Sequence, residues 1–344
     1  MKAAVLTGIR RMEVRDVPDP KIEKDTDVLL KIDMVGICGS DVHYFETGRI
    51  GSQVVQFPYI VGHECAATVA AVGKGTRHVK VGQKVVVEPA ISCHECDQCR
   101  RGRENTCFKL RFLGTPGQGN GCLSEFIVMP EECCFPIDGK ITVQQGVLCE
   151  PLAIGAYAVK QAKVAPTMDL AIFGAGPIGL SCLVCAQAEG VRSCCMTEKI
   201  DSRRETARKG GAAWVGNPLK EDVVAAILKQ RPLGMDVAFE CAGQQETIDQ
   251  AVDVLRAGGK LMLVGIPRED RVSFAIDKIR RKEITIVNIR RQNGCTGRAI
   301  ELVASGKVKP DFMVTHHFGL DRIQEAFELV AGYRDGVVKA MIDM

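Results

Sequence analysis

The pattern of apolar and polar positions changes near residue 150. Before it, short apolar or alternating runs are separated by glycine, proline and long polar stretches. The first fourteen residues alternate as a strand does, and further runs lie at residues 28–34, 67–72, 84–88 and 124–128. Short runs of this kind between turn residues are typical of β-strands joined by loops. The pattern therefore predicts a mostly β domain over residues 1–150.

From about residue 165 onward, apolar strand-like runs alternate with helical patterns. The predicted strands are residues 169–173, 192–197, 235–239, 260–264 and 283–289. The predicted helices are residues 178–189, 202–209, 222–229 and 247–255. Regular alternation indicates a parallel sheet covered by helices on both faces. We therefore expect a doubly wound α/β domain over residues 151–290.

The last segment, residues 291–344, has helical patterns at 297–305 and 321–331 around a strand-like run at 312–318. We expect this segment to return to the first domain. Two domains agree with a length of 344 residues, which is enough to bury a sizeable core. The predicted fold class is therefore α/β, with a mostly β domain joined to a doubly wound parallel sheet.

The composition excludes several classes of protein. Hydrophobic residues make up 46% and charged residues 25% of the chain, and the net charge of +3 argues against a nucleic-acid partner. No apolar stretch reaches membrane-spanning length without a charge or breaker, and the N-terminus lacks an apolar signal segment. Several of the sixteen cysteines stand alone in apolar runs, as buried thiols do in a reducing compartment. We expect a cytoplasmic protein without a membrane partner.

Four cysteines at spacings of three, three and eight form the sharpest motif of the chain. They are Cys93, Cys96, Cys99 and Cys107. A loop that folds back can bring four thiolates to tetrahedral distance around one ion, and such a shell favours Zn²⁺. Because four sulfurs fill the shell, this zinc should stabilise a lobe and take no part in chemistry.

A second set of possible ligands mixes a thiol, an imidazole and carboxylates. Cys38 and His63 are ligand types that zinc accepts, and the carboxylate of Glu64 or Glu150 could complete the shell. A position left to water or substrate would let the metal act as a Lewis acid toward an alcohol. On spacing alone, the alternative is a structural role for the cysteine and the histidine.

An alcohol that is oxidised at such a site must also lose a proton. Ser40 and His43, two and five residues after Cys38, are candidates for a relay to solvent. The pattern thus predicts catalytic residues directly after the first ligand.

A glycine turn between an apolar strand and a helix predicts a dinucleotide site. Gly174, Gly176 and Gly179 permit a tight turn and close approach to a pyrophosphate, and Pro177 opens the helix whose N-terminus attracts it. Glu198, nineteen positions after Gly179, could accept the ribose hydroxyls and repel a 2′-phosphate, which favours NAD over NADP. A glycine turn that serves packing alone is the alternative. Three basic residues just after Glu198 leave the preference between NAD and NADP open: Lys199, Arg203 and Arg204.

Taken together, these motifs resemble the zinc-containing medium-chain dehydrogenase/reductase family over essentially the whole chain. Within it, the sequence is most similar to the sorbitol (polyol) dehydrogenase branch. The residues that carry this likeness are Cys38-Gly-Ser-Asp-Val-His-Tyr44, Gly62-His63-Glu64, Thr115-Pro116, Cys149-Glu150-Pro-Leu-Ala153, Val264-Gly265 and Val314-Thr-His-His-Phe318. The resemblance implies a GroES-like catalytic domain and a Rossmann domain, with the active site in the cleft between them.

The resemblance also implies roles for single residues. Cys38, His63 and Glu64 match the catalytic zinc ligands, and Glu150 matches the acid that binds the zinc water or the metal itself. Substrate-pocket positions are matched by Tyr44, Phe112, Glu150 and Arg290. Nucleotide contacts are matched by Ile178, Glu198, Arg203, Val264, Gly265, Ile266, Ile289, Arg290 and Arg291. Two zinc ions per chain and NAD are the implied cofactors.

The implied reaction transfers a hydride from a secondary alcohol of a polyol or sugar acid to NAD and leaves a ketone. Arg290 and Arg291 together could hold a carboxylate, which would favour an aldonate, although Arg291 could equally contact the cofactor phosphate or a neighbouring chain. A threonine 3-dehydrogenase, another zinc alcohol dehydrogenase and a non-catalytic zinc-binding protein are the alternatives. The family suggests a homodimer or homotetramer.

Overall fold

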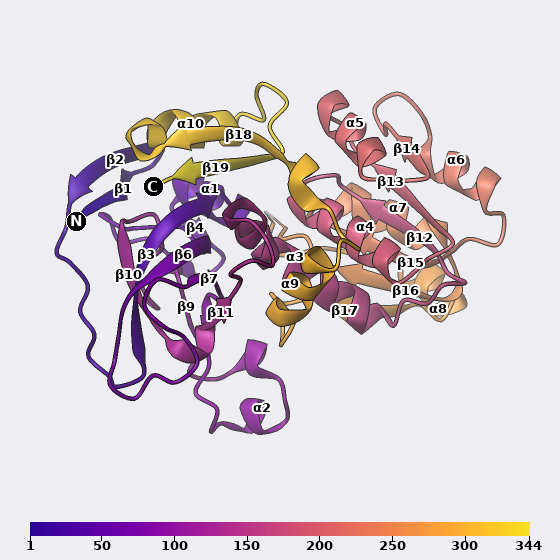
Figure 1. Ribbon diagram of the computed structural model, residues 1–344. Helices are drawn as coiled ribbons and strands as arrows, with labels where there is room; N and C mark the ends of the chain where they lie inside the picture. Colours follow the sequence, from indigo (N-terminus) through magenta and orange to yellow (C-terminus); the bar gives the residue numbers. More distant parts are fainter. Residues whose placement is uncertain (268) are drawn as a thin grey trace. The chain divides into compact units, whose positions relative to one another are not determined.

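The computed structural model describes residues 1–267 and 269–344 and divides them into two compact units (Figure 1). Unit 1 consists of Met1–Glu150 and Val314–Met344, and unit 2 of Pro151–Met313. The boundary expected at residue 291 is therefore too early, because residues 291–313 belong to unit 2. The reason is packing: the ring of Phe312 lies so close to Gly210 that a Cβ there would meet it at 2.9 Å.

A seven-stranded sheet forms the centre of unit 1. Its strand order is β11-β7-β6-β3-β19-β18, and β10 also pairs with β3. The bounds are β3 (Asp27–Gly36), β6 (Glu64–Val72), β7 (Lys84–Val87), β10 (Phe126–Pro130), β11 (Cys134–Pro136), β18 (Val314–Gly319) and β19 (Lys339–Asp343). Smaller antiparallel pairs are β1 (Lys2–Gly8) with β2 (Arg11–Asp16), β4 (Arg49–Ile50) with β5 (Gln53–Val54), and β8 (Ala90–Ile91) with β9 (Arg111–Phe112). The expected mostly β domain is thus present.

The C-terminal strand β19 completes this sheet beside β3. The two strands run antiparallel, with Met341 opposite Gly36 and Ile342 opposite Val35. In Figure 1 the yellow end of the chain accordingly lies against its indigo beginning within unit 1. Buried apolar residues of both strands belong to one core, so burial of their apolar surface stabilises the return of the chain.

Helices cover parts of unit 1 and lead into unit 2. α1 (Gly39–Thr47) packs on α10 (Ile323–Ala331) through Phe45 and Phe327, whose ring centroids are 5.3 Å apart. The short α2 (Asp97–Arg100) lies in the four-cysteine lobe. The long α3 (Val143–Ala162) runs across the division between the units at residue 150.

Unit 2 is built on a six-stranded parallel sheet with the order β14-β13-β12-β15-β16-β17. The strands are β12 (Asp169–Phe173), β13 (Ser193–Thr197), β14 (Trp214–Gly216), β15 (Met235–Glu240), β16 (Leu255–Leu263) and β17 (Thr285–Asn288). The helices are α4 (Pro177–Ala188), α5 (Asp201–Lys209), α6 (Val223–Gln230), α7 (Gln245–Val254), α8 (Ile276–Arg281) and α9 (Thr296–Ala304). This order reverses between β12 and β15, as in the Rossmann fold, which confirms the predicted doubly wound sheet.

Two further features of the described residues bear on the expectations from composition. No helix among residues 1–267 and 269–344 is long and apolar enough to cross a membrane. All sixteen cysteines are free thiols in the part of the chain that the structure describes.

Candidate active site and zinc sites

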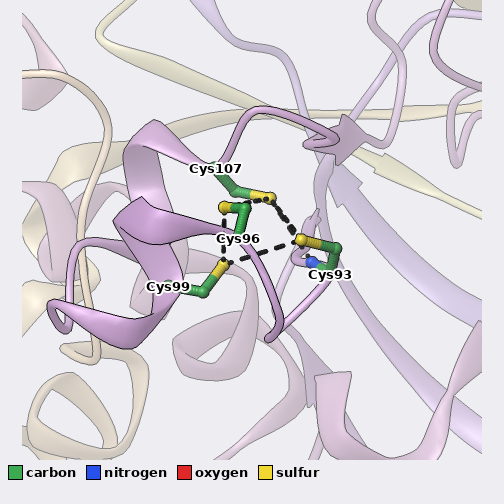
Figure 2. Close-up of side chains that lie close together, drawn as sticks. All are labelled: Cys93, Cys96, Cys99 and Cys107. Atoms are coloured by element: carbon green, nitrogen blue, oxygen red, sulfur yellow. Dashed lines mark hydrogen bonds between the residues drawn. The ribbon is translucent and has the colours of Figure 1, made fainter.

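The four cysteines of the lobe converge on one point (Figure 2). The sulfur–sulfur distances are 3.4 Å for Cys93 and Cys107, 3.5 Å for Cys96 and Cys99, 3.9 Å for Cys96 and Cys107, and 4.0 Å for Cys93 and Cys99. Four ligands at a Zn–S distance of about 2.3 Å stand about 3.8 Å apart in a tetrahedron. The observed distances bracket this value, so the cluster fits one zinc ion.

Backbone groups around the lobe prepare its sulfurs for a cation. N–H groups of Cys99 and Phe108 lower the pKa of Cys96 to about 6. Burial instead raises the pKa of Cys99 to about 12 in the metal-free protein. A zinc ion would hold all four sulfurs as thiolates, because metal coordination deprotonates a thiol outright. The lobe is thus a thiol cluster whose full charge requires a metal.

The second metal group forms where β3 ends and β6 begins. Gly36 of β3 pairs with Glu64 of β6, which brings Cys38 next to His63 and Glu64. Their ligand atoms all lie within 4.8 Å of one another, and His63 and Glu64 are buried. A Cβ at Gly36 would overlap the Glu64 carboxylate, so the glycine leaves room for this side chain. The structure therefore brings together the three ligands suggested by the sequence.

Asp41 on α1 holds this group together and was not predicted from the sequence. Its fully buried carboxylate accepts hydrogen bonds from the backbone N–H of Cys38 and of Gly62, each at 3.1 Å. It also lies 3.4 Å from Nδ1 of His63, which leaves Nε2 as the ligand atom. Burial opposes a charge on His63, but Asp41 and Cys38 raise its pKa well above the ordinary value. The only sequence signal was an acidic residue in the first turn of a helix.

Lys339 on β19 is the second residue that the sequence did not indicate. Its ammonium donates to both carboxylate oxygens of Glu64, at 2.8 and 2.6 Å, and to the Ile37 carbonyl at 3.1 Å. Burial opposes its charge, yet Glu64 and Cys38 raise the pKa of Lys339 above the ordinary value. A lysine inside a buried apolar strand is a weak signal, because nothing in the sequence names its partner.

Glu150 lies on α3 and is the remaining carboxylate of this site. It is buried, and its Oε2 has no hydrogen-bond partner among the described residues. Burial, together with the neighbouring Glu64 and Glu88 carboxylates, raises the pKa of Glu150 to about 8 against the opposing effect of His63. An unpartnered buried oxygen is costly, and a metal ion or a water bound to it would satisfy it. The donor set of this site therefore fits a zinc ion with room for a further ligand.

The relay and substrate residues predicted in unit 1, apart from Glu150, lie on α1 and on β9. Ser40 and His43 lie half-buried on α1, directly after Cys38. The Tyr44 hydroxyl donates to Gln53 at 3.2 Å. The Phe112 ring lies 5.4 Å from the His63 ring, so this aromatic residue does border the metal site. The roles of these residues stay predictions.

The glycine turn has the geometry that a dinucleotide requires. Gly174 has a φ of 98°, which favours glycine, and a Cβ at Gly179 would overlap the Gly174 carbonyl. Gly176 caps α4, and Arg203 Nη1 lies 3.6 Å from where a Cβ on Gly176 would stand. Open backbone at a helix N-terminus beside a guanidinium is a cradle for phosphate.

Glu198 follows β13 and is fixed beside this turn. Its Oε2 accepts from the Ala175 N–H at 2.9 Å, and its Oε1 accepts from the Ile200 N–H at 3.0 Å. The guanidinium of Arg204 donates to the carbonyls of Glu198 and Lys199. The carboxylate is therefore held where the second strand ends, as expected for a ribose-binding acid.

The other predicted cofactor residues all lie in unit 2. Pro177 and Ile178 open α4, and the Val264 and Gly265 N–H groups both donate to the Glu240 carbonyl at 2.9 Å. Ile266 is half exposed, and the Ile289 N–H donates to the Leu263 carbonyl. The two arginines that follow differ: Arg290 is exposed, whereas Arg291 is half-buried with a φ of 54°. Arg290 thus belongs to a different unit from Tyr44 and Phe112.

Comparison with known proteins identifies the family of this chain. Residues 24–139 match the family described as alcohol dehydrogenase GroES-like domain, and residues 177–305 match zinc-binding dehydrogenase. The chain is 36% identical over 343 residues to a sorbitol dehydrogenase of Bacillus subtilis (strain 168), covering 99% of this chain and 97% of that protein. It is 34% identical over 350 residues to an L-idonate 5-dehydrogenase of Vitis vinifera, covering 99% and 94%.

A solved structure agrees over the same length. An oxidoreductase/dehydrogenase of unknown specificity from Escherichia coli has a TM-score of 0.94 and 32% sequence identity, covering 99% of this chain and 98% of that one. The chain belongs to the zinc-containing medium-chain dehydrogenase/reductase family, with a GroES-like domain and a Rossmann domain. The expected family, fold class and enzyme class, an oxidoreductase acting on CH–OH groups, are thereby confirmed.

Proposed function

We propose that this protein oxidises a secondary hydroxyl of a polyol or sugar acid, with zinc and NAD as cofactors. The hydride passes from the carbinol carbon to the nicotinamide, which yields a ketone, NADH and one proton. The observation that carries this proposal is the donor set of Cys38, His63 and Glu64 beside the unpartnered Glu150 oxygen. Such a shell leaves a position for a substrate oxygen, unlike the four-sulfur cluster.

The residues around the metal site have distinct tasks in this reaction. Zinc, when bound, supplies the Lewis acidity that favours loss of the alcohol proton. Asp41 orients the His63 ring through Nδ1. We assign Ser40 and His43 to the relay that carries the proton to solvent, because they follow Cys38 on the same helix. Phe112, at the His63 ring, shields the site from water.

Cofactor preference follows from Glu198. A carboxylate held by two backbone N–H groups can accept the ribose hydroxyls of NAD and repels the 2′-phosphate of NADP. Arg203 lies above the glycine turn, where it would meet the pyrophosphate that both cofactors share.

Two sources support the substrate class. The relatives named above are a sorbitol dehydrogenase and an L-idonate 5-dehydrogenase, a polyol enzyme and a sugar-acid enzyme. Arg290 and Arg291 are adjacent cations in unit 2, and a guanidinium binds a carboxylate bidentately. We therefore include aldonates with the polyols.

A substrate panel tests the proposal directly. Purified protein should contain two zinc atoms per chain and form NADH with polyols or aldonates, and chelation should abolish this activity. Full activity after removal of both zinc ions would refute the proposal.

Arg291→Tyr and the charge-preserving Arg291→Lys should lower kcat/KM for gulonate or galactonate more than for sorbitol. Equal effects on both substrates would remove the sugar-acid part.

Assembly and location complete the proposal. We propose a homodimer or homotetramer in which β17, the edge strand of the unit 2 sheet, pairs with a second copy. Light scattering of the purified protein at micromolar concentration tests this directly, and a monomer would refute it. Sixteen free thiols support a reducing compartment, and we place the protein in the cytoplasm. That it has no membrane or nucleic-acid partner stays a prediction.

A further inference from the structure

Lys339 is a fully buried cation inside the proposed metal site. Only 1% of its side chain is exposed, and the same holds for its partner Glu64. The ammonium contacts both Glu64 oxygens and the Ile37 carbonyl, so its three donors are used. A lysine buried this completely is rare unless it is paired, which indicates a specific role.

The backbone fixes where this ammonium stands. Lys339 begins β19, and the Ile37 N–H donates to the Ala340 carbonyl at 3.0 Å, directly beside the bond from Lys339 to the Ile37 carbonyl. Its neighbours Val338 and Ala340 are buried in the apolar core. The lysine therefore cannot swing away to solvent, and Glu64, whose side chain is also only 1% exposed, is held beside it by both hydrogen bonds.

The groups around Lys339 are otherwise acidic. Its ammonium contacts Glu64 of β6. Cys38, after the end of β3, and Glu150 of α3 also interact with it electrostatically and raise the pKa of Lys339. Asp41 on α1 adds another buried carboxylate to the same site. Among the described residues, Lys339 is the cation that the structure pairs with Glu64, whereas His63 faces Asp41. An uncompensated buried carboxylate is strongly unfavourable.

We propose that Lys339 is a positioning residue that fixes the Glu64 carboxylate and balances its charge, so that the site stays folded without its metal. This inference rests on the proposed function only where that function makes Glu64 a metal ligand. One Glu64 oxygen can face a metal while the ammonium keeps the other. If Lys339 is removed, a divalent cation becomes the remaining counter-charge for Glu64, and folding becomes dependent on it.

The test compares zinc-loaded and metal-free protein for Lys339→Met, which keeps the length of the side chain and removes its charge. Melting temperature and zinc atoms per chain are measured for each form. We expect the melting temperature of the metal-free variant to fall by roughly 10 °C, with most of the loss recovered on adding zinc. The lobe zinc contributes equally to wild type and variant, so it cancels in the comparison.

Lys282→Met is the matched control. The Lys282 ammonium donates to three backbone carbonyls, of Val252, Asp253 and Leu255, and contacts no metal ligand. This variant should lose the same stability with and without zinc. If Lys339→Met behaves like it, the lysine is merely structural and the proposal is wrong.

The double variant Glu64→Gln/Lys339→Met removes both charges and keeps the test decisive if the single variant does not fold. It should regain metal-free stability over Lys339→Met, while its stability no longer responds to zinc at this site. A double variant as unstable as the single one would overturn the proposal. Wild-type oxidation of polyols with NAD is measured separately, so failure of this inference and failure of the proposed function are distinguishable.

Discussion

Replacing Asp41 with asparagine should weaken zinc binding at the site of Cys38 and His63. The carboxylate accepts from two backbone N–H groups and lies at Nδ1 of His63. An asparagine of the same size has one acceptor oxygen, so its amide nitrogen must face at least one of these donors. The imidazole then loses the partner that orients it and makes it a stronger ligand.

The size of the effect depends on pH. Loss of an outer partner of a ligating histidine typically costs about 10- to 100-fold in metal affinity, or about 1.4–2.8 kcal/mol. Against this, Asp41 raises the pKa of His63, so zinc must displace a proton from the wild-type imidazole. This competition fades as pH rises through that pKa. The ratio of zinc dissociation constants between variant and wild type should therefore grow with pH.

A competition titration with a zinc-binding dye between pH 6 and 9 measures this ratio. Asp27→Asn is the matched control, because the buried Asp27 also accepts from two backbone N–H groups, of Glu23 and Lys24, without contact to a ligand. The control should lower the melting temperature and leave zinc affinity unchanged. Equal zinc affinity of Asp41→Asn and wild type across this range would refute the reasoning.

Three further predictions concern the other charged and thiol groups. Cys99→Ser should remove one zinc per chain and destabilise the protein by several kcal/mol without changing kcat for the remaining folded molecules, since the closed shell does no chemistry; elemental analysis and single-turnover rates check this. In the metal-free folded protein, the pKa values of Glu150 and His63 are raised, so the folded state binds more protons than the unfolded state. The melting temperature of the metal-free protein should therefore fall as pH rises from 5 to 9. The zinc-loaded protein should lack this slope, and a metal-free melting temperature that rises with pH would contradict the assignment. Glu198→Gln should lower kcat/KM for NAD by about tenfold or more and lower that for NADP less, whereas equal losses would show that the carboxylate does not select the cofactor.

Local spacing was enough to predict both the lobe and the glycine turn. The four cysteines span only fifteen residues, and short loop closure brings them together whatever the rest of the chain does. The turn at Gly174 and Gly176 likewise depends on a strand and a helix that adjoin it. The alternating strands and helices of unit 2 were predictable because each element carries its own apolar periodicity.

The metal site of unit 1 was predictable only in part. Cys38, His63 and Glu64 could be proposed from their ligand chemistry, but their meeting depends on the register in which Gly36 faces Glu64. The boundary at residue 291 was placed too early because the sequence does not show that Phe312 packs against Gly210. Helix periodicity reveals that an element is amphipathic, not which domain covers its apolar face.

The amino-acid sequence by itself determined the chemistry available to this protein: two sets of zinc ligands, a phosphate-binding turn and a mostly β domain joined to a parallel sheet. Only the tertiary structure decided how the first metal site is supported. Lys339 meets Glu64 across 275 residues of sequence, and Asp41 reaches His63 through a helix that begins after β3. Such contacts depend on strand order and on the antiparallel return of β19 to β3, which no local pattern encodes.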